Sequence, residues 1–221
     1  MKILEAKNLK KYYGKEPNLK KALDSASLSV EQGEYVSILG PSGSGKSSLL
    51  NLLSGLDTPT SGYVNVRGIN LRDLNDEQLT IFRRRNIGFV FQNYNLIPFL
   101  NVFENIVLQV KLNGDTVEKN MLNEIVHMLH LGSIINYMPS SISNSECQRV
   151  ALARALIIRP AIIFADEPTG NLDEKTGTDV IGLLKVANHW FNQTIIMATH
   201  SRNVACIADR IIKIENGKVK N

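Results

Sequence analysis

The sequence predicts an α/β fold in which helices flank a mostly parallel sheet, with an antiparallel β subdomain at the N-terminus and an inserted helical subdomain. Three observations support this prediction. Short apolar runs alternate with amphipathic helical patterns along most of the chain, which is typical of a parallel sheet joined by crossover helices. The first 70 residues hold closely spaced strand patterns, which favours antiparallel pairing there. From residue 101 to about residue 159 the apolar residues recur at helical spacing.

Length and composition exclude several classes of protein. The 221 residues suffice for one large domain with a buried core, and 43% apolar with 21% charged residues is ordinary for a soluble globular protein. This balance excludes a largely disordered chain. A net charge of +4 does not by itself indicate nucleic-acid binding, so we expect no nucleic-acid partner. Two cysteines exclude a disulfide scaffold and suit a reducing compartment.

The chain shows no pattern typical of a membrane span or a signal peptide. The most apolar region, 151–165, is interrupted by two arginines and a proline. The N-terminal lysine is followed by no long apolar run. We therefore expect a cytoplasmic protein that a partner can hold at a membrane. Short basic clusters at 10–11, 20–21 and 83–85 fit either solvated faces or contacts with a partner or a phospholipid surface.

The elements of the N-terminal part follow from short apolar runs and their boundaries. Residues 34–39 form a strand pattern that ends abruptly in a loop rich in glycine and serine, and residues 46–55 place four leucines on one side of a helix. Asn75 can cap a helix over 77–84, because two acidic residues follow it and favour the positive end of the helix dipole. Further strands are expected at 3–6, 26–30, 63–66 and 87–91.

A glycine-rich loop lies between the expected strand at 34–39 and the helix that follows. Its sequence matches G-x-x-x-x-G-K-[ST] in full, and the matching residues are Gly40, Pro41, Ser42, Gly43, Ser44, Gly45, Lys46 and Ser47. Glycines let such a loop wrap closely around a phosphate, and the N-terminus of the following helix adds a positive dipole. Lys46 can reach the β- and γ-phosphates, and the Ser47 hydroxyl can coordinate Mg²⁺. The loop predicts a P-loop NTPase core that binds a nucleoside triphosphate with Mg²⁺.

The C-terminal part returns to alternating strands and helices, with buried strands expected at 161–165, 194–198 and 211–214. Within the helical block, Gly132 is expected to stop a helix. We expect a single domain, 1–221, without a flexible linker. In it, 1–92 and 160–221 form the nucleotide-binding core with the antiparallel β subdomain, and 93–159 form the helical subdomain.

Two acidic residues end the expected strand at 161–165. Asp166 lies where a carboxylate would hold Mg²⁺, and Glu167 lies where a general base could polarise the attacking water. Acidic pairs at strand ends are also common as solvated or helix-capping groups, but a P-loop enzyme needs this second acid. Gln92 and His200 likewise follow expected strands, from which their side chains can approach Mg²⁺ and the γ-phosphate.

The order of these motifs resembles the ATP-binding subunit of an ABC transporter over essentially the whole chain. The motifs are Walker A at 40–47, a Q-loop at Gln92, a signature region at 142–149, Walker B ending at Glu167, a D-loop at 171–173 and a switch histidine at His200. Within this superfamily, residues 40–51, 95–98 and 165–173 resemble the MacB/LolD type. That subgroup includes Gram-positive ATPases paired with permeases for detoxification of antimicrobial peptides. The resemblance implies the ABC ATPase fold.

The resemblance also implies a function. The protein would be an ATPase, with ATP and Mg²⁺, that powers an integral-membrane permease for export or detoxification of a peptide, antibiotic or lipophilic substrate. It would act as a homodimer or heterodimer that closes on ATP, at the inner face of the cell membrane. The alternatives are an ABC-type ATPase that transmits force or signal without transport, and a weakly catalytic nucleotide-binding subunit of a heterodimer.

The site residues that the resemblance implies fall into three groups. The catalytic residues are Lys46, Gln92, Glu167 and His200, and the Mg²⁺ ligands are Ser47, Gln92 and Asp166. The ATP contacts are Tyr13, Ser48, Ser143 and the residues of the loop 40–47. Tyr13 would stack on adenine, and Tyr12 is the weaker candidate for that role. Ordinary packing on a strand is the alternative for either tyrosine.

The signature region departs from the family pattern, Leu-Ser-Gly-Gly-Gln/Glu. It reads Ile142-Ser143-Asn144-Ser145-Glu146, which keeps the serine and lacks both glycines. The spacing of Ser143 and Glu146 is that of a capping box, which would start a helix whether or not a phosphate docks there. Where the family glycines serve a close approach or a positive φ, Asn144 and Ser145 would be strained. We therefore expect weak hydrolysis when the subunit pairs with itself.

The segment 93–104 is expected to face a cytoplasmic element of the permease. It carries three large apolar residues, Phe99, Leu100 and Phe103, in a region expected to be partly exposed. Packing inside the helical subdomain is the alternative for each of them.

Overall fold

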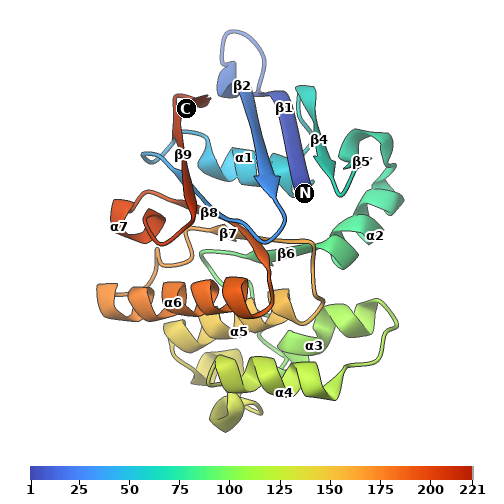
Figure 1. Ribbon diagram of the computed structural model, residues 1–221, viewed down its shortest axis with the longest axis vertical. Helices are drawn as coiled ribbons and strands as arrows, with labels where there is room; N and C mark the ends of the chain where they lie inside the picture. The colour runs from blue at the N-terminus through green and yellow to red at the C-terminus, as the bar shows by residue number, and fades with distance from the viewer. Residues whose placement is uncertain (221) are drawn as a thin grey trace.

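An antiparallel sheet forms one end of the molecule (Figure 1). The structure, a computed structural model, describes residues 1–220. The antiparallel sheet has the strand order β2-β1-β4-β5. Its strands are β1 (Lys2–Tyr13), β2 (Lys20–Glu31), β4 (Ser61–Val66) and β5 (Ile69–Asn70).

A six-stranded sheet forms the centre, with the order β10-β9-β3-β8-β7-β6. Its strands are β3 (Tyr35–Leu39), β6 (Ile87–Val90), β7 (Ile162–Asp166), β8 (Thr194–Thr199), β9 (Arg210–Glu215) and β10 (Lys218–Lys220). Five of them are parallel, and only the edge strand β10 runs antiparallel to its neighbour β9. The carboxyl ends of the parallel strands therefore meet at one edge of the sheet.

Helices cover both faces of the central sheet. The α-helices are α1 (Lys46–Leu53), α2 (Asp76–Asn86), α3 (Val102–Leu112), α4 (Lys119–Met128), α5 (Asn144–Leu156), α6 (Glu174–Trp190) and α7 (Arg202–Ala205). Short 3₁₀ turns occur at Leu71–Asp73, Gly132–Ile134 and Pro139–Ser141. Figure 1 shows α1 on the side of the antiparallel sheet and α5 and α6 on the other side, with α3 and α4 beyond them. Within residues 1–220, no helix is long and apolar enough to cross a bilayer.

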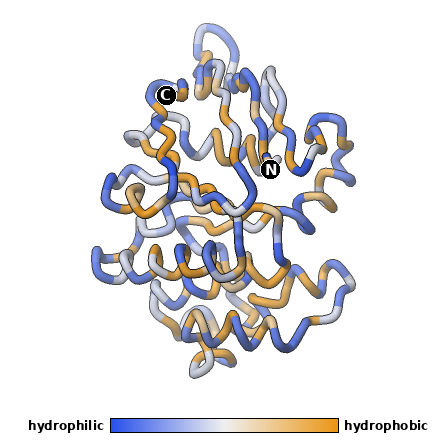
Figure 2. Tube along the Cα trace, in the orientation of Figure 1, coloured by the Kyte–Doolittle hydropathy of each residue, from blue (hydrophilic) through white to orange (hydrophobic). Residues whose placement is uncertain are grey.

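Two apolar clusters occupy the two faces of the central sheet. Strand β7 shows the division, because Ile162 and Phe164 pack with the antiparallel sheet and α1, whereas Ile163 and Ala165 pack with α3 to α6. The central strands are among the most hydrophobic parts of the trace (Figure 2), as expected for strands buried on both faces. The helices between β6 and β7 share their buried core with one face of the central sheet.

Every strand and helix expected from the sequence occurs, with boundaries shifted by a few residues. The strands β1 and β2 reach 12 residues each, longer than expected, and β5 and β10 were not expected. The Asn75 cap is confirmed, because its side chain accepts from Gln78 N at 2.8 Å. The expectation for Gly132 is wrong. Helix α4 ends at Met128, and His130 rather than the glycine takes the left-handed conformation, with φ 53°.

Candidate functional site

The sequence motifs meet because each follows a parallel strand of the central sheet. The phosphate loop follows β3, Gln92 follows β6, Glu167 follows β7 and His200 follows β8. These four strands are neighbours in the order β3-β8-β7-β6. A shared cleft of about 870 Å³ lies against the loop at this edge, and this volume suits a ligand of nucleotide size.

The phosphate loop needs its glycines at particular positions. Gly45 has φ 104°, and a Cβ there would lie 2.5 Å from the carbonyl oxygen of Ala22 on β2. A Cβ at Gly40 would lie 2.3 Å from the carbonyl oxygen of Ile214 on β9. No side chain fits at either position, so the loop is held between two strands from opposite ends of the chain.

The Lys46 ammonium lies inside the loop, with the residue only 6% exposed. Its Nζ donates to the carbonyl oxygens of Gly40 at 2.9 Å and Pro41 at 3.0 Å, and it lies 3.4 Å from Glu167 Oε1. The cation is therefore positioned by backbone dipoles and by one carboxylate.

Glu167 connects two motifs across the cleft. While Oε1 faces Lys46, Oε2 lies 3.0 Å from His200 Nδ1. The residue has φ 45°, a left-handed conformation that is uncommon for a glutamate and places its side chain between the two partners. This arrangement suits a carboxylate that must face the end of a bound polyphosphate.

Asp166 is a buried carboxylate with an unsatisfied oxygen. Its Oδ1 has no hydrogen-bond partner within the structure. Burial raises the pKa of the Asp166 carboxyl, a hydrogen bond from Ser47 lowers it in part, and the nearby charge of Glu167 raises it further. An oxygen that lacks a donor, beside a serine hydroxyl at a phosphate loop, fits a hard divalent cation such as Mg²⁺.

Gln92 packs against the segment after the acidic pair. Asn171 Nδ2 donates to Gln92 O at 3.0 Å and to Asn93 Oδ1 at 2.9 Å. A Cβ at Gly170 would lie 2.6 Å from Gln92 Nε2, so the glycine makes room for the amide. The Q-loop and the D-loop thus form one hydrogen-bonded unit at the cleft.

The two tyrosines have different surroundings. Tyr13 lines the cleft and is 41% exposed, and its hydroxyl donates to Asp57 Oδ2 at 2.9 Å. The Tyr12 hydroxyl instead donates to Asp24 at 3.1 Å, and Tyr12 does not line the cleft. Of the two, only Tyr13 therefore presents a ring to a nucleotide held in the cleft.

The cleft brings together most of the expected residues and some that sequence reasoning missed. The expected residues that line it are Tyr13, Pro41, Ser42, Gly43, Gly45, Lys46, Ser47, Ser48, Gln92, Glu167 and His200. Gly40, Ser44, Asp166 and Ser143 do not line it. The missed residues are Lys20, Lys21, Ala22, Asn216 and Gly217. The two lysines were visible as a basic cluster, but no local signal linked them to the loop.

Ser143 caps helix α5. Its hydroxyl oxygen accepts from the Glu146 N–H at 3.3 Å, and its backbone N–H donates to Glu146 Oε2 at 2.8 Å, so the capping box is confirmed. Asn144 and Ser145 are the first residues of α5, and neither has a positive φ. The expectation of a positive φ at these two positions is wrong, because they lie in the first turn of a helix, a conformation that any residue adopts. Strain from a close approach to a second subunit stays a prediction.

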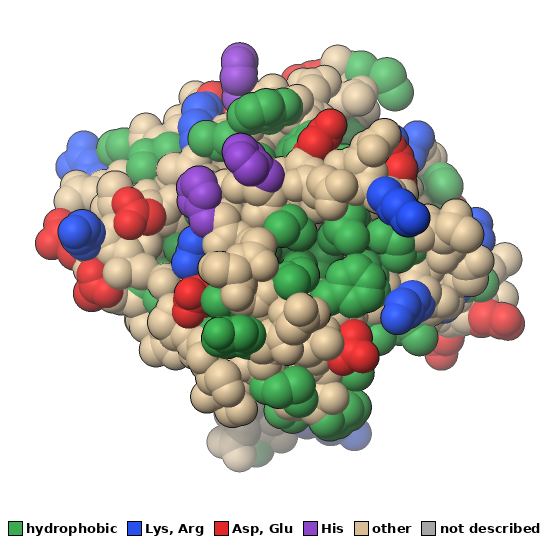
Figure 3. All heavy atoms as spheres, turned by 90° about the horizontal axis from the view of Figure 1, so that it is seen from below, with side chains coloured by type: hydrophobic (Ala, Val, Ile, Leu, Met, Phe, Trp, Pro, Cys, Tyr) green, Lys and Arg blue, Asp and Glu red, His purple; other side chains and the backbone are tan. Residues whose placement is uncertain are grey.

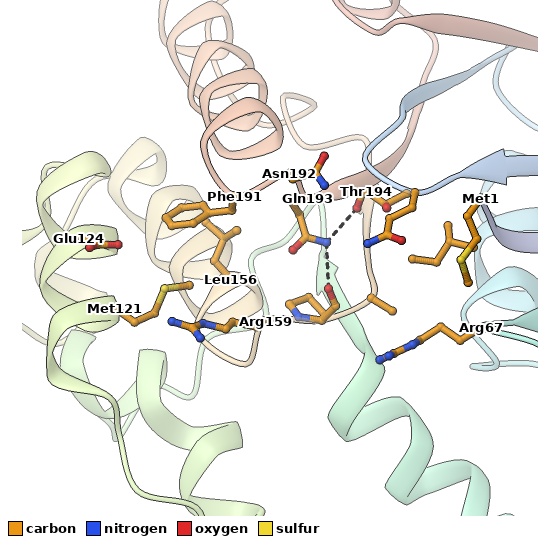
Figure 4. A pocket seen from close by; sticks show the side chains of 14 residues that line it. Met1, Arg67, Met121, Glu124, Leu156, Arg159, Phe191, Asn192, Gln193 and Thr194 are labelled. Carbon is orange, nitrogen blue, oxygen red and sulfur yellow. Dashed lines mark hydrogen bonds between the residues drawn. The ribbon is translucent and has the colours of Figure 1, made fainter.

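A second hollow, of about 510 Å³, lies at the opposite, amino-terminal ends of β7 and β8 (Figure 4). Its guanidinium groups belong to Arg67 and Arg159, which lie at different sides of the hollow. The central amide, Gln193, already donates to the carbonyl oxygens of Pro160 and Thr194, both at 3.1 Å. The polar groups of this second hollow do not converge on one point, in contrast to those of the cleft beside the phosphate loop.

Comparison with known proteins agrees with this geometry. Residues 23–170 match the family model described as ABC transporter. The solved dimer of the ATP-binding cassette MJ0796 from Methanocaldococcus jannaschii, in a post-hydrolysis state with ADP and Pi, is 41% identical. It superposes with a TM-score of 0.89, over 99% of this chain and 97% of that one. The chain belongs to the ABC transporter family, as an ATP-binding subunit with ATPase function.

Two relatives give its place within the family. The bacitracin export ATP-binding protein BceA of Halalkalibacterium halodurans is 39% identical over 99% of this chain and 87% of that protein. The macrolide export ATP-binding/permease protein MacB of Hyphomonas neptunium is 40% identical over 98% of this chain and 34% of that longer protein. These matches support the MacB/LolD-type subgroup.

Proposed function

We propose that this subunit binds Mg·ATP in the cleft beside Lys46 and uses its hydrolysis to drive a permease that exports or detoxifies a peptide, antibiotic or lipophilic compound. The observation that carries the proposal is the position of Glu167 between Lys46 and His200. That arrangement serves phosphoryl transfer to water, and the named functions of BceA and MacB support an export substrate.

Each residue has a part in the proposed reaction. Lys46 binds the β- and γ-phosphates in place of its present carbonyl partners. Glu167 accepts the proton of the attacking water, and His200 orients that carboxylate. Ser47 and Asp166 hold Mg²⁺, with Gln92 completing the set. The ion supplies positive charge that stabilises the phosphate oxygens.

The adenine end of the cleft is proposed to lie at Tyr13. The hydrogen bond to Asp57 fixes the ring, and a fixed aromatic ring loses little entropy when a base stacks on it. Stacking accepts any base, so the preference for ATP comes from the family.

Ser143 is proposed to serve the nucleotide of a second subunit. It caps α5 outside the lining of its own cleft, and the solved MJ0796 cassette is a dimer. A homodimer and a heterodimer remain the two forms of this proposal, and the backbone conformation of the altered signature favours neither.

The proposed permease contact lies on the segment between Gln92 and α3. Phe99 is 76% exposed there, whereas Phe103 packs against the core. Other exposed apolar residues of the helical subdomain are Leu112, Tyr137 and Met138. Figure 3 shows the molecule from its helical end, where apolar side chains gather near the middle of the face. Contact with a permease would hold the subunit at the inner face of the membrane.

Cysteine cross-linking tests the permease contact. Cys206 is exposed and is first replaced by serine, so that the added thiol is the reactive one. Phe99→Cys or Asn95→Cys should cross-link to a permease co-expressed from a neighbouring gene. The matched control is Ile69→Cys, which is 43% exposed on β5 in the antiparallel sheet. Cross-links from the control alone would refute the assigned surface.

A further inference from the structure

Helix α5 carries a buried arginine whose charge meets no carboxylate. Arg154 is 8% exposed, and among residues 1–220 no acidic group forms an ion pair with it. Its guanidinium donates instead to two successive carbonyl oxygens, through NH1 to Asn95 O at 2.6 Å and through NH2 to Tyr94 O at 2.8 Å. The planar fork of the guanidinium meets each acceptor with its own nitrogen, whereas an ammonium would have to serve both oxygens from a single nitrogen.

The backbone that Arg154 binds is in an unfavourable conformation. Tyr94 has φ 60° and Asn95 has φ 50°, both in the left-handed region. Two consecutive left-handed residues without glycine persist only where the surroundings hold them. The paired carbonyl contacts supply that restraint, because both oxygens must face the guanidinium at once.

The same segment is held from two other directions. Downstream, the buried Asn105 accepts from Ile97 N at 2.8 Å and donates to Leu100 O at 2.8 Å. Upstream, Asn171 donates to Gln92 O at 3.0 Å. Arg154 is the link between this segment and α5, the helix that begins after Ser143.

We propose that Arg154 is a positioning residue for Gln92: it locks the left-handed turn two residues downstream, so that Gln92 keeps its place at the cleft and moves together with α5. The inference rests on the proposed role of Gln92 at the nucleotide. Arg154 does not line the cleft, so it acts through the backbone of residues 92–95 and not on ATP.

A double-mutant cycle tests the proposal on the full-length subunit. Arg154→Lys keeps the charge and loses the fork. We expect kcat for ATP hydrolysis to fall about ten- to a hundredfold, because a displacement of about 1 Å in a positioned group can cost up to about 10²-fold, with KM changed less than about twofold. In the Gln92→Ala background, Arg154→Lys should cause no further loss, since its effect passes through Gln92.

Arg83→Lys is the matched control. Arg83 lies on α2, outside the signature region and the cleft lining, and its NH1 donates to Gly55 O at 2.9 Å. It should leave kcat and KM unchanged. Hydrogen exchange gives a second measurement, and Arg154→Lys should speed exchange of the Tyr94, Ile97 and Leu100 amides about tenfold, with the sheet amides unaffected.

The outcomes separate two failures. If Gln92→Ala leaves kcat unchanged, the proposed role of Gln92 is wrong. If Gln92→Ala lowers kcat but Arg154→Lys lowers it equally in both backgrounds, Arg154 is merely structural and the positioning role is refuted. Unchanged hydrogen exchange at the Tyr94 and Ile97 amides in Arg154→Lys would show that Arg154 does not lock the turn. The exchange measurement does not depend on turnover, so it remains decisive even if the isolated subunit hydrolyses ATP slowly.

Discussion

Asp166 should destabilise the nucleotide-free subunit, so replacing it with asparagine should stabilise that form while weakening its response to Mg·ATP. Asp166 Oδ1 is buried without a hydrogen-bond partner. A buried polar atom without a partner costs about 1–3 kcal/mol, and more when charged. Asparagine removes the charge but still leaves one polar atom unpaired. We therefore expect a gain of about 1 kcal/mol, or roughly 2–4 °C in Tm for a chain of this size.

Thermal unfolding with EDTA and with Mg·ATP measures both effects. In EDTA, Asp166→Asn should melt above the wild type. With ligand at a hundred times its Kd, the wild type should gain about 2.7 kcal/mol, and the variant should gain clearly less. Asp209→Asn is the control, because it should change Tm in the opposite direction. Burial tends to raise the pKa of Asp209, but hydrogen bonds from Lys185 and the Tyr35 N–H lower it overall, so its removal should lower Tm regardless of Mg²⁺.

The pH dependence has a defined sign. The pKa of Asp166 is raised in the folded state, chiefly by burial. At pH values between the ordinary aspartate pKa and this raised pKa, the folded state therefore binds more protons than the unfolded state. Stability then falls as pH rises through that window. The advantage of Asp166→Asn should be absent below the window and complete above it. A variant that melts below wild type in EDTA at neutral pH, or that responds fully to Mg²⁺, would refute this reasoning.

Three further predictions concern the other motifs. Lys46→Ala removes a charged phosphate contact worth about 1.5–3 kcal/mol, so ATP affinity, measured by titration calorimetry, should fall at least tenfold; an unchanged affinity would contradict the phosphate-loop assignment. Glu167→Gln should keep ATP binding but lower turnover by about 10²–10⁴ in a phosphate-release assay, and nearly unchanged turnover would place the base elsewhere. Asn144→Gly with Ser145→Gly relieves no backbone strain, because both residues are helical. It should lower Tm by roughly 1–4 °C, at about 0.3–0.5 kcal/mol per glycine, and a tenfold rise in ATPase rate would show instead that the two side chains obstruct closure.

Much of the site could be predicted from the sequence because its motifs are local. The spacing of Gly40, Gly45 and Lys46 indicated a phosphate loop from the sequence alone. The structure gives the reason for the two glycines, since a side chain at either position would clash with a neighbouring strand. Helix caps are equally local, and the expected cap at Asn75 and the expected capping box at Ser143 are both present. The acidic pair ends a short apolar run that follows Pro160, and a run of this length with such a boundary is typical of a buried strand.

The tertiary structure alone decided which side chains face one another. The strand order β3-β8-β7-β6 brings Lys46, Glu167 and His200 together from distant parts of the chain, and no local pattern specifies that order. The same holds for Asp57 beneath Tyr13.

The backbone conformations at two motifs also needed the folded structure. A missing pair of glycines suggested strain at Asn144, but the residue lies in the first turn of a helix. The left-handed turn at Tyr94 contains no glycine, so no local pattern predicted it. Its stabilising contact comes from Arg154 on α5, which is distant in the sequence. A sequence records the conformations that neighbours in the chain favour, whereas contacts between distant elements can override them once the sheet has formed.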